Sequence, residues 1–554
     1  MNHNLFDIRP EQIHRTRVEL TYFQGRNAYG PSFALVLSDQ HPCRRPREAD
    51  PLMTTTNVSP DDPASTATQG SGTRRRLGVP AVTFMIIAAS APLTVLAGGV
   101  TTTFAITKVT GVPLSFLVVG AVLAVFVVGY ATMSRFVVNA GAFYAYIAQG
   151  LGRPVGVGGS IVALVAYNAM QIGIYGVFGF TVSSQLSAWF GIAVPWWIPV
   201  LAGIVIVGVL GVNRVDLSAK VLGILVALEF AVVILFDVIS FAHAPEGTSV
   251  AGLAPGNLFV PGVGAVLAGA AAAFMGFESA AIYGEESKDP KRTVARATFL
   301  AVGVIAVFYA VSAWAMTVGA GPSSVVDAAT SQGPDLVFSF LTAHVGQIVA
   351  DLGHLLFITS LFAALVSFHN AVARYLFSLG REGVLPAVLG RLRTRTGAPA
   401  VGSLTQSALA LVVIAGFVIA GASWVPPEGQ SAALFPVVTL FAWLTTTGAL
   451  GLVLLMVVVS VAVIGFFRTR RHAVGVWQRL VAPGLATVAL GAVLVLIVAN
   501  FNVLLTSDPT APPTVATFVL PAMLAVSGLV GIGWGLVLRR RRPAVYSRIG
   551  HGVD

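Results

Sequence analysis

Ionisable side chains interrupt several of the longest apolar runs in this 554-residue chain. Glu278 ends the run GAVLAGAAAAFMGFE, and Glu229 and Asp237 lie within VLGILVALEFAVVILFD. His354 and His369 lie in a third run. A charge in hydrocarbon costs free energy, so such side chains commonly bind a proton, an ion or a substrate. Glu229 and Glu278 are the main candidates, whereas Asp237 lies near one end of its run and is expected to meet interfacial water.

Two apolar runs also contain residues that interrupt a helix. Pro92 stands inside IIAASAPLTVLAGG, and Gly276 stands just before Glu278. Irregular backbone at membrane depth persists only where it is buried in protein or lines a cavity. Two interrupted helices five spans apart are typical of a transporter built from inverted repeats, in which helix N-terminal amides hold an anion. The alternative is that both residues merely kink their helices.

The composition indicates that these runs cross a membrane. Hydrophobic residues make up 56% of the chain and charged residues 10%, which excludes water-soluble classes. The net charge of +10 comes from short clusters between apolar runs, so we expect no nucleic-acid partner. The single cysteine, Cys43, excludes an internal disulfide framework and a cysteine-built metal site. We expect no metal and no cofactor.

The elements that must position these residues are membrane helices. A span needs about 20 mostly apolar residues. The sequence predicts twelve such helices, at 80–106, 112–133, 155–181, 195–212, 217–240, 261–283, 294–319, 346–378, 401–421, 432–464, 480–503 and 514–537. With both termini in the cytoplasm, the cytoplasmic segments from Arg74 onward hold 25 Lys and Arg residues and the outer loops hold only Lys108. This alternation supports both the number of twelve helices and the orientation with both termini in the cytoplasm.

Three segments carry a resemblance to a known family. GFESAAIYGEESKDPKRTVARATF (276–299) resembles the signature that runs from the sixth into the seventh helix of amino acid–polyamine–organocation permeases. RYLFSLGREGVLPAVLG (374–390) is similar to the exit of that family's eighth helix, and NAGAFYAYIAQGLGRPVG (139–156) to its segment between helices two and three. The resemblance covers about residues 79–540 and points to an amino acid permease of bacterial type.

The resemblance implies an all-α integral membrane fold with a five-plus-five inverted repeat and two accessory helices. The ten-helix transport core is expected at 79–464, the accessory helices at 465–540 and a cytoplasmic C-terminal tail at 541–554. Residues 1–78 are polar and are expected to form a disordered cytoplasmic tail. Within that tail, residues 1–52 could lie upstream of the native start, because Met53 opens an ordinary cytoplasmic start sequence.

The resemblance also implies where a substrate would bind and which charges would gate the site. The expected substrate-binding residues lie at the two helix interruptions and on neighbouring helices: Ser90, Ala91, Leu93, Thr94, Phe274, Gly276, Glu278, Ser279, Tyr167 and Asn370. The expected gating residues form ion pairs on the cytoplasmic side: Glu285, Glu286, Lys288, Arg292, Arg153 and Arg381. Each pair could instead be a solvated loop contact that only sets topology. Glu278 could instead cap the following half-helix without touching substrate.

Three positions depart from the family pattern. The first helix has Ser-Ala-Pro-Leu where the family commonly has a glycine-rich break, and Pro92 removes an amide. Ala272 stands where a gating aromatic is often found. Glu229 stands where many proton-coupled relatives carry a lysine, nine residues after Lys220. As a coupling residue Glu229 could carry a proton, pair with a cationic substrate or form part of a sodium site, or it could only be hydrogen-bonded between helices.

The leading hypothesis is a secondary active transporter that moves an amino acid across the cell membrane by alternating access, coupled to protons or to exchange. A polyamine or other organic-amine transporter is the alternative within that class. A membrane-embedded enzyme or a channel is the rival class, but the sequence shows no nucleotide-binding or zincin motif and no nucleophile with its base. The expected partners are the small-molecule substrate, protons and the lipid bilayer, and the sequence assigns no oligomeric state.

Overall fold

The computed structural model describes residues 78–137, 143–213, 219–278, 289–426, 430–469, 473–508 and 510–550, together with two short strands near the N-terminus. The chain divides into two units, Met1–Gly70 and Ser71–Asp554. In the first unit β1 (Tyr22–Phe23) pairs antiparallel with β2 (Arg26–Asn27). The rest of the predicted N-terminal tail, with Cys43 and Met53, lies outside the described residues.

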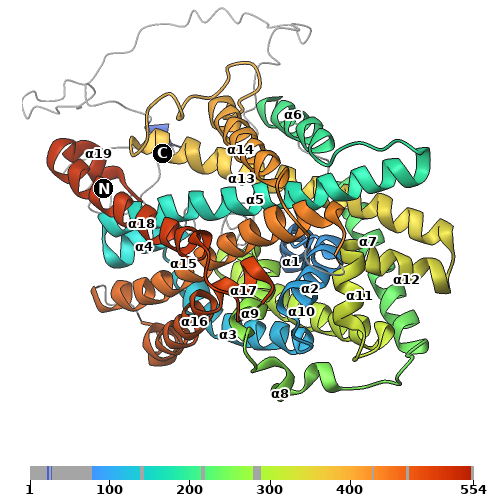
Figure 1. Ribbon diagram of the computed structural model, residues 1–554. Coiled ribbons are helices and arrows are strands. Elements are labelled where there is room, and N and C mark those ends of the chain that lie inside the picture. Colours follow the sequence, from blue (N-terminus) through green and yellow to red (C-terminus); the bar gives the residue numbers. More distant parts are fainter. Residues whose placement is uncertain are drawn as a thin grey trace, which may run out of the picture. The chain divides into compact units, whose positions relative to one another are not determined.

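Helices form every regular element in the described part of the second unit (Figure 1). The α-helices are α1 (Val79–Ala89), α2 (Thr101–Thr107), α3 (Val112–Met133), α4 (Phe143–Leu151), α5 (Arg153–Phe190), α6 (Trp197–Asn213), α7 (Ala219–Ala242), α8 (Pro255–Leu258), α9 (Val263–Ala273), α10 (Pro290–Ala320), α11 (Val325–Gln332), α12 (Leu336–His344), α13 (Gln347–Glu382), α14 (Ala400–Gly421), α15 (Ala442–Thr469), α16 (Ala482–Ala499), α17 (Phe501–Thr506), α18 (Val515–Arg541) and α19 (Pro543–Arg548). Short π-helices are η3 (Thr94–Val100), η8 (Pro436–Phe441) and η9 (Trp477–Val481), and 3₁₀ turns are η4 (Ala251–Leu253), η6 (Gly333–Asp335) and η7 (Ala432–Leu434).

Nine helices among the described residues are long and apolar enough to cross a membrane. Three shorter apolar helices accompany them: Thr94–Thr107, Trp197–Asn213 and Val263–Ala273. Every span predicted from the sequence overlaps one of these segments. The described part of the second unit is therefore all-helical, and the chain is a multi-pass membrane protein.

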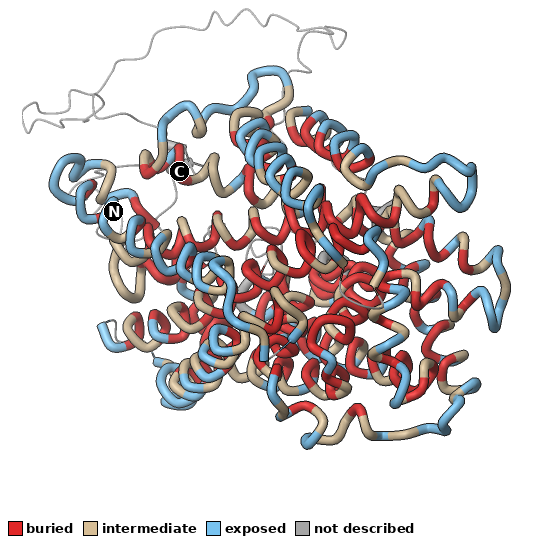
Figure 2. Tube along the Cα trace, in the orientation of Figure 1, coloured by how far each residue is buried: buried red, intermediate tan, exposed pale blue. Residues whose placement is uncertain are grey.

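The outer helices turn apolar side chains away from the protein. Buried residues gather in the middle of the bundle, while α6, α14 and α18 are largely exposed on one side (Figure 2). The exposed residues there are apolar, including Val209 on α6, Ile419 on α14, and Phe518 and Leu529 on α18. Contiguous exposed apolar faces of this kind fit contact with lipid.

The long helix α5 is central to the packing. It packs against α4, α13, α15 and α18, while α3 packs against α9, α10 and α16. Close contact with α18 depends on small residues, since a Cβ added to Gly531 would lie 2.8 Å from the Cα of Gly158. Small residues let membrane helices approach closely and gain dispersion contacts, which is the main attraction available between helices in lipid.

Two segments predicted as loops are more ordered than expected. The connection GPSSVVDAATSQGPD contains α11 and η6, and α12 follows it. Beside it, Lys108 donates a 2.6 Å hydrogen bond to Thr330, and partial desolvation lowers the pKa of Lys108 although Asp327 opposes this effect. These helices are too short to be predicted from apolar periodicity.

The predicted C-terminal tail also contains structure. It forms α19, and Ile549 is buried in a cluster with Tyr144 and Leu379. The amide of Gly550 donates a 3.2 Å hydrogen bond to the Tyr144 hydroxyl, which itself donates to Glu382. The described part of the tail, residues 541–550, is ordered because its apolar residues pack into this cluster, which no local pattern reveals.

Candidate functional site

The first predicted span breaks halfway along its length. Helix α1 ends at Ala89, Ser90 forms a turn, and Ala91 takes a left-handed backbone with φ of 49°. The chain turns helical again at Pro92 and continues through η3 and α2. Proline lacks an N–H and suits the first turn of a helix, which explains why the new helix starts here. A left-handed alanine costs about 1–2 kcal/mol, so the surrounding packing must hold it.

The second break follows α9. The helix ends at Ala273, Phe274 to Gly276 form a turn, and Gly276 has φ of 111°. Residues with side chains rarely adopt this backbone, so glycine is required at the turn. Phe277 and Glu278 form one further short turn, and residues 279–288 lie outside the described part of the chain.

Glu229 lies against the first break. Its carboxylate accepts a 2.7 Å hydrogen bond from the Ser360 hydroxyl on α13 and a longer one, 3.4 Å, from the Leu93 amide. Ser360 lies 3.1 Å from the Thr94 hydroxyl. The Glu229 side chain is buried, and it sits at the N-terminal end of the second half-helix, where the helix dipole stabilises negative charge. The break, α7 and α13 thus meet at a single carboxylate.

Glu278 forms a hydrogen bond within the second break. Its Oε2 accepts a 2.9 Å hydrogen bond from the Gly276 amide, and its Oε1 accepts one from the Tyr167 hydroxyl on α5. The Tyr130 hydroxyl donates to the Glu278 carbonyl at 2.9 Å. Glu278 is buried, and both of its carboxylate oxygens have partners within the protein. These contacts tie Glu278 to the turn before it, and capping of the following half-helix by Glu278 stays a prediction because residues 279–288 lie outside the described residues.

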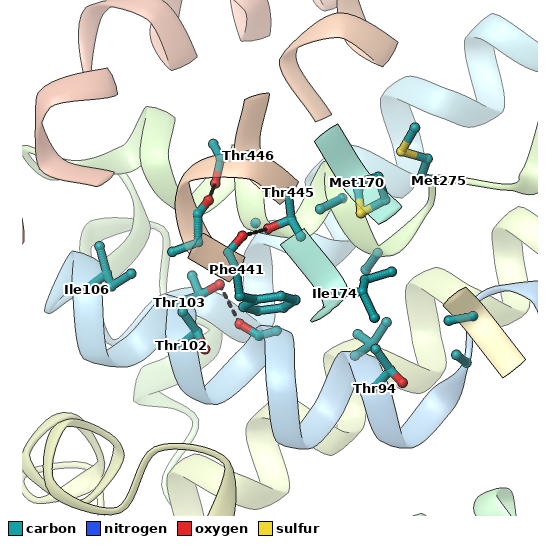
Figure 3. A pocket seen from close by; sticks show the side chains of 18 of the residues that line it. Thr94, Thr102, Thr103, Ile106, Met170, Ile174, Met275, Phe441, Thr445 and Thr446 are labelled. Atoms are coloured by element: carbon teal, nitrogen blue, oxygen red, sulfur yellow. Dashed lines mark hydrogen bonds between the residues drawn. The ribbon is translucent and has the colours of Figure 1, made fainter. Parts of the chain in front are cut away.

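A cavity lies between the two breaks, with an empty volume of about 810 Å³ that includes the open solvent within it. Figure 3 shows residues from several helices around it. The lining residues come from the first break, η3 and α2, from the turn of the second break, and from α3, α5, α9, α13, η8, α15 and α17. They are Ser90, Ala91, Thr94, Val95, Gly99, Thr102, Thr103, Ile106, Thr107, Phe116, Met170, Ile174, Ala265, Gly269, Ala272, Ala273, Met275, Ala364, Phe368, Phe441, Ala442, Thr445, Thr446 and Leu504. None of these lining residues is ionisable.

Some of the predicted substrate-binding residues line the cavity and others do not. Ser90, Ala91 and Thr94 line the cavity. The other predicted residues that the structure describes are not among the lining residues: Leu93, Tyr167, Phe274, Gly276, Glu278 and Asn370. Tyr167 packs behind the lining residue Phe368, with ring centroids 6.3 Å apart. Ser279 lies outside the described residues.

The polar part of the cavity wall consists mainly of threonine hydroxyls. Thr103, Thr445 and Thr446 donate hydrogen bonds of 2.8, 2.7 and 2.6 Å to the carbonyl four residues earlier in the same helix. Thr102 is buried, and its hydroxyl has no hydrogen-bond partner among the described residues. A hydroxyl that donates still offers lone pairs. The wall therefore presents hydrogen-bond acceptors and methyl groups, which suits a ligand with an N–H donor and apolar surface.

The two buried histidines belong to other contacts. His369 Nε2 lies 2.7 Å from the Ser403 hydroxyl on α14, and its Nδ1 lies 3.4 Å from the Gln171 amide nitrogen on α5. Both ring nitrogens therefore have partners outside the cavity. His354 Nε2 lies 3.5 Å from the Asp335 carboxylate of η6, so this side chain faces η6.

Asp237 does not meet interfacial water, contrary to the prediction. Its side chain is buried, and it accepts a 2.8 Å hydrogen bond from Ser312 on α10. The position along the run was correct, but α10 covers this face of α7, which the apolar pattern of α7 alone does not reveal.

The predicted gating residues are only partly described. Arg292 lies 3.9 Å from Asp289, which caps α10, and both side chains are exposed. The Arg153 guanidinium lies 5.2 Å from the Tyr546 ring centroid on α19. Arg381 lies 5.5 Å from the ring of Phe377. The remaining predicted gating residues, Glu285, Glu286 and Lys288, lie outside the described residues. Gating by these charges stays a prediction.

Three residues at the site were not singled out by the sequence. The Tyr309 hydroxyl on α10 lies 2.8 Å from the Ser90 hydroxyl and so holds the first break. Ser360 holds Glu229, and Phe441 lines the cavity at the end of a π-helix. Pro436, five residues before Phe441, is a signal of irregular helix that could have drawn attention to this segment. Tyr309 and Ser360 carry no such local signal.

Comparison with known proteins gives one match. Residues 77–529 match the model of a protein family described as amino acid permease. This confirms the resemblance inferred from the three sequence motifs. A search of curated proteins finds no match to the chain.

Proposed function

This chain belongs to the amino acid permease family, and we propose that it is a secondary active transporter that carries an amino acid across the cell membrane by alternating access. The twelve apolar segments form a five-plus-five inverted repeat with two accessory helices. Both termini face the cytoplasm, so the Lys108 end of the second half-helix of the first span is extracellular. Family membership and the apolar helices favour a transporter over an enzyme.

The observation that carries this proposal is the pair of broken helices around one cavity. The first break contributes Ser90, Ala91 and Thr94 to the cavity wall, and α9, which ends at the second break, contributes Ala272 and Ala273. Broken helices at membrane depth expose peptide dipoles that can bind a zwitterion without a dedicated ionised side chain. The threonine acceptors suit the ammonium group, and the methyl and aromatic groups suit an apolar side chain.

Glu229 is the coupling residue in this proposal. It is the ionisable group that contacts both the half-helix of the first break, through Leu93, and the opposing helix α13, through Ser360. Neutralising the carboxylate would weaken both hydrogen bonds, because charge-assisted hydrogen bonds are stronger than neutral ones. Proton binding at Glu229 would therefore loosen the second half-helix of the first span from α7 and α13, which links the proton to the conformational change.

Counterflow in proteoliposomes tests the transport function. Purified protein is reconstituted with a concentrated unlabelled amino acid inside, and uptake of the same labelled amino acid is followed from outside. We expect transient accumulation above the equilibrium level with at least one member of the twenty common amino acids. Liposomes without protein provide the baseline. Absence of counterflow with all amino acids would contradict the proposal.

An organic amine is the second candidate substrate, favoured by the threonine hydroxyl acceptors in the otherwise apolar cavity wall. A thermal-shift screen with amino acids and with amines lacking a carboxylate separates the two, since a ligand that binds only the folded state raises the apparent stability. At a ligand concentration about 100 times its Kd the gain is about 2.7 kcal/mol. Stabilisation by amines alone would favour the second candidate.

A further inference from the structure

We infer that Phe441 is the occluding residue of the transport site: its ring separates the compartment at the first break from the rest of the cavity. This inference rests on the proposed transport function for its role, whereas the shielding by the ring can be tested without transport. It assigns to η8 the occluding role that the family resemblance implies for α9. Ala272, the position on α9 where an aromatic was expected, presents only a methyl group to the cavity.

The position of the ring along the half-helix is the first argument. Thr94, Gly98 and Thr102 follow one another at intervals of four residues, so they lie on one face of the helix. A Cβ added to Gly98 would lie 3.7 Å from Cζ of Phe441, so the tip of the ring reaches this helix at Gly98. Thr94 and Thr102 both line the cavity, on either side of that contact. Figure 3 shows the ring between Thr94 and Ile174 on one side and Thr102, Thr103 and Ile106 on the other.

The contacts of the cavity's aromatic rings supply the second argument. Three phenylalanines line the cavity, and two of them pack against a tyrosine in the wall: Phe116 against Tyr309, at 5.7 Å, and Phe368 against Tyr167, at 6.3 Å. Phe441 has no ring-stacking partner among the described residues. The ring also lines the cavity. Because it has no ring partner, rotation about the side-chain bonds of Phe441 would not break an aromatic pair.

The backbone of Phe441 is held in place, and its buried side chain forms part of the cavity wall. Gly176 on α5 lies so close to η8 that an added Cβ would be 2.3 Å from the Pro436 carbonyl oxygen and 3.0 Å from the Phe441 nitrogen. The Phe441 carbonyl accepts the hydrogen bond of Thr445. The π-helical turn is therefore anchored on both sides, and such turns recur at functional sites in membrane and soluble proteins. A fixed backbone with a ring pointing into a cavity is the arrangement that a side-chain gate requires.

The residues that line the cavity near the first break leave room for the Phe441 ring to cover that part of the cavity. They also determine which substrates fit beneath the ring. The residues around the compartment at the break are small or flexible, including Ala91, Ala273 and Met275. A substrate side chain bound there would contact the face of the Phe441 ring. Since no lining residue is ionisable, an apolar side chain would be favoured there over a charged one.

Thiol accessibility tests the separation without requiring transport. In a C43S background, which removes the single cysteine, I174C reports on the compartment at the break and T103C on the other side of the ring. The positively charged reagent MTSET is added to purified protein in detergent, and the modification rates are compared with Phe441 present and in F441A. The rate at a shielded thiol follows the population in which the shield is open, so we expect F441A to speed modification of I174C about tenfold.

The controls decide between a gate and a general loosening. T103C modification should change by less than about twofold in F441A, because that position does not lie behind the ring. F441L keeps apolar bulk and guards against a folding defect, and it should give an intermediate rate at I174C. A272F combined with F441A should restore slow modification by supplying a ring from α9. An unchanged rate at I174C in both Phe441 variants, or an equal increase at T103C, would overturn the inference.

L-leucine as a probe links the gate to the site. It should slow modification of I174C in protein with Phe441 and should lose most of that effect in F441A. Failure of L-leucine and of the other common amino acids to protect I174C in protein with Phe441 would count against the proposed amino acid site. The modification rates of I174C and T103C measured without ligand would still test whether Phe441 acts as a gate.

Discussion

The two helix breaks differ in what they do with their exposed backbone. Both have a buried glutamate within hydrogen-bonding distance of a freed amide: Glu229 at Leu93 and Glu278 at Gly276. At the first break the glutamate comes from another helix and the contact is long, 3.4 Å. At the second break the glutamate comes from the same turn, the contact is 2.9 Å, and Tyr167 also donates to the carboxylate.

This difference suggests different tasks for the two glutamates. Glu229 links separate helices through a few hydrogen bonds, so a change in its charge alters how those helices are held together. Glu278 satisfies its own turn, so a change there alters mainly the stability of the turn. The first break lines the cavity through Ser90, Ala91 and Thr94, whereas the turn of the second break lines it through Met275 but not through Gly276, and Glu278 does not line it. The first break is therefore suited to coupling and the second to scaffolding.

The largest expected effect separates the two glutamates by function. E229Q should abolish accumulation of substrate against its gradient while counterflow persists, because the variant keeps the shape of the side chain but cannot exchange a proton. E278Q is the matched control and should retain accumulation at a reduced rate. Uptake driven by a pH gradient in proteoliposomes measures both. Undiminished accumulation by E229Q would remove this residue from the coupling mechanism.

Truncation of the second glutamate should have the largest effect on stability. E278A leaves the Tyr167 hydroxyl and the Gly276 amide without their acceptor. Each unpaired buried donor costs about 1–3 kcal/mol, so we expect a loss of roughly 3 kcal/mol in the free energy of unfolding. Thermal unfolding of purified protein in one detergent gives the comparison with Y167F, which should lose less. Equal stability of E278A and the unmodified protein would contradict the scaffolding role.

Reciprocal backbone substitutions should sharpen the contrast between the turns. G276A forces a side chain into a backbone with φ of 111° and should cost about 1–3 kcal/mol. A91G relieves left-handed strain of about 1–2 kcal/mol, but glycine loses more conformational freedom on folding, so the net change should be close to zero. The midpoints of thermal unfolding of the two variants provide the measurement. A loss for A91G as large as that for G276A would show that the Ala91 methyl group makes an essential contact.

The smallest expected effect concerns the support of the first break. Y309F removes the hydroxyl that lies 2.8 Å from Ser90 but keeps the ring that packs on Phe116. The loss of one neutral hydrogen bond should lower stability by about 0.5–1.5 kcal/mol. Thermal unfolding should detect a modest shift, and F116L, which disturbs the ring packing instead, provides a comparison. A larger fall in the midpoint of thermal unfolding for Y309F than for E278A would show that the Tyr309–Ser90 contact contributes more stability than we infer.

Apolar run length was enough to predict the long helices and the interrupted ones. Helices α3, α10 and α14 begin and end within a few residues of the predicted spans, because a membrane helix must be apolar over its whole length. Pro92 and Gly276 marked the two breaks because their effects on the backbone are local. The short helices α11, α12 and α19 were not predicted, since each is stabilised by contacts with distant segments.

The sequence by itself determined the class of protein, the apolar segments, the two weak points and the buried carboxylates, since each depends on composition or on a residue's own backbone chemistry. Only the tertiary structure decided which partners these residues meet. It brought Ser360 to Glu229, turned Glu278 toward Tyr167 and away from the cavity, and buried Asp237 against Ser312. Membrane helices are apolar on every face, so periodicity does not tell which face of one helix packs on another.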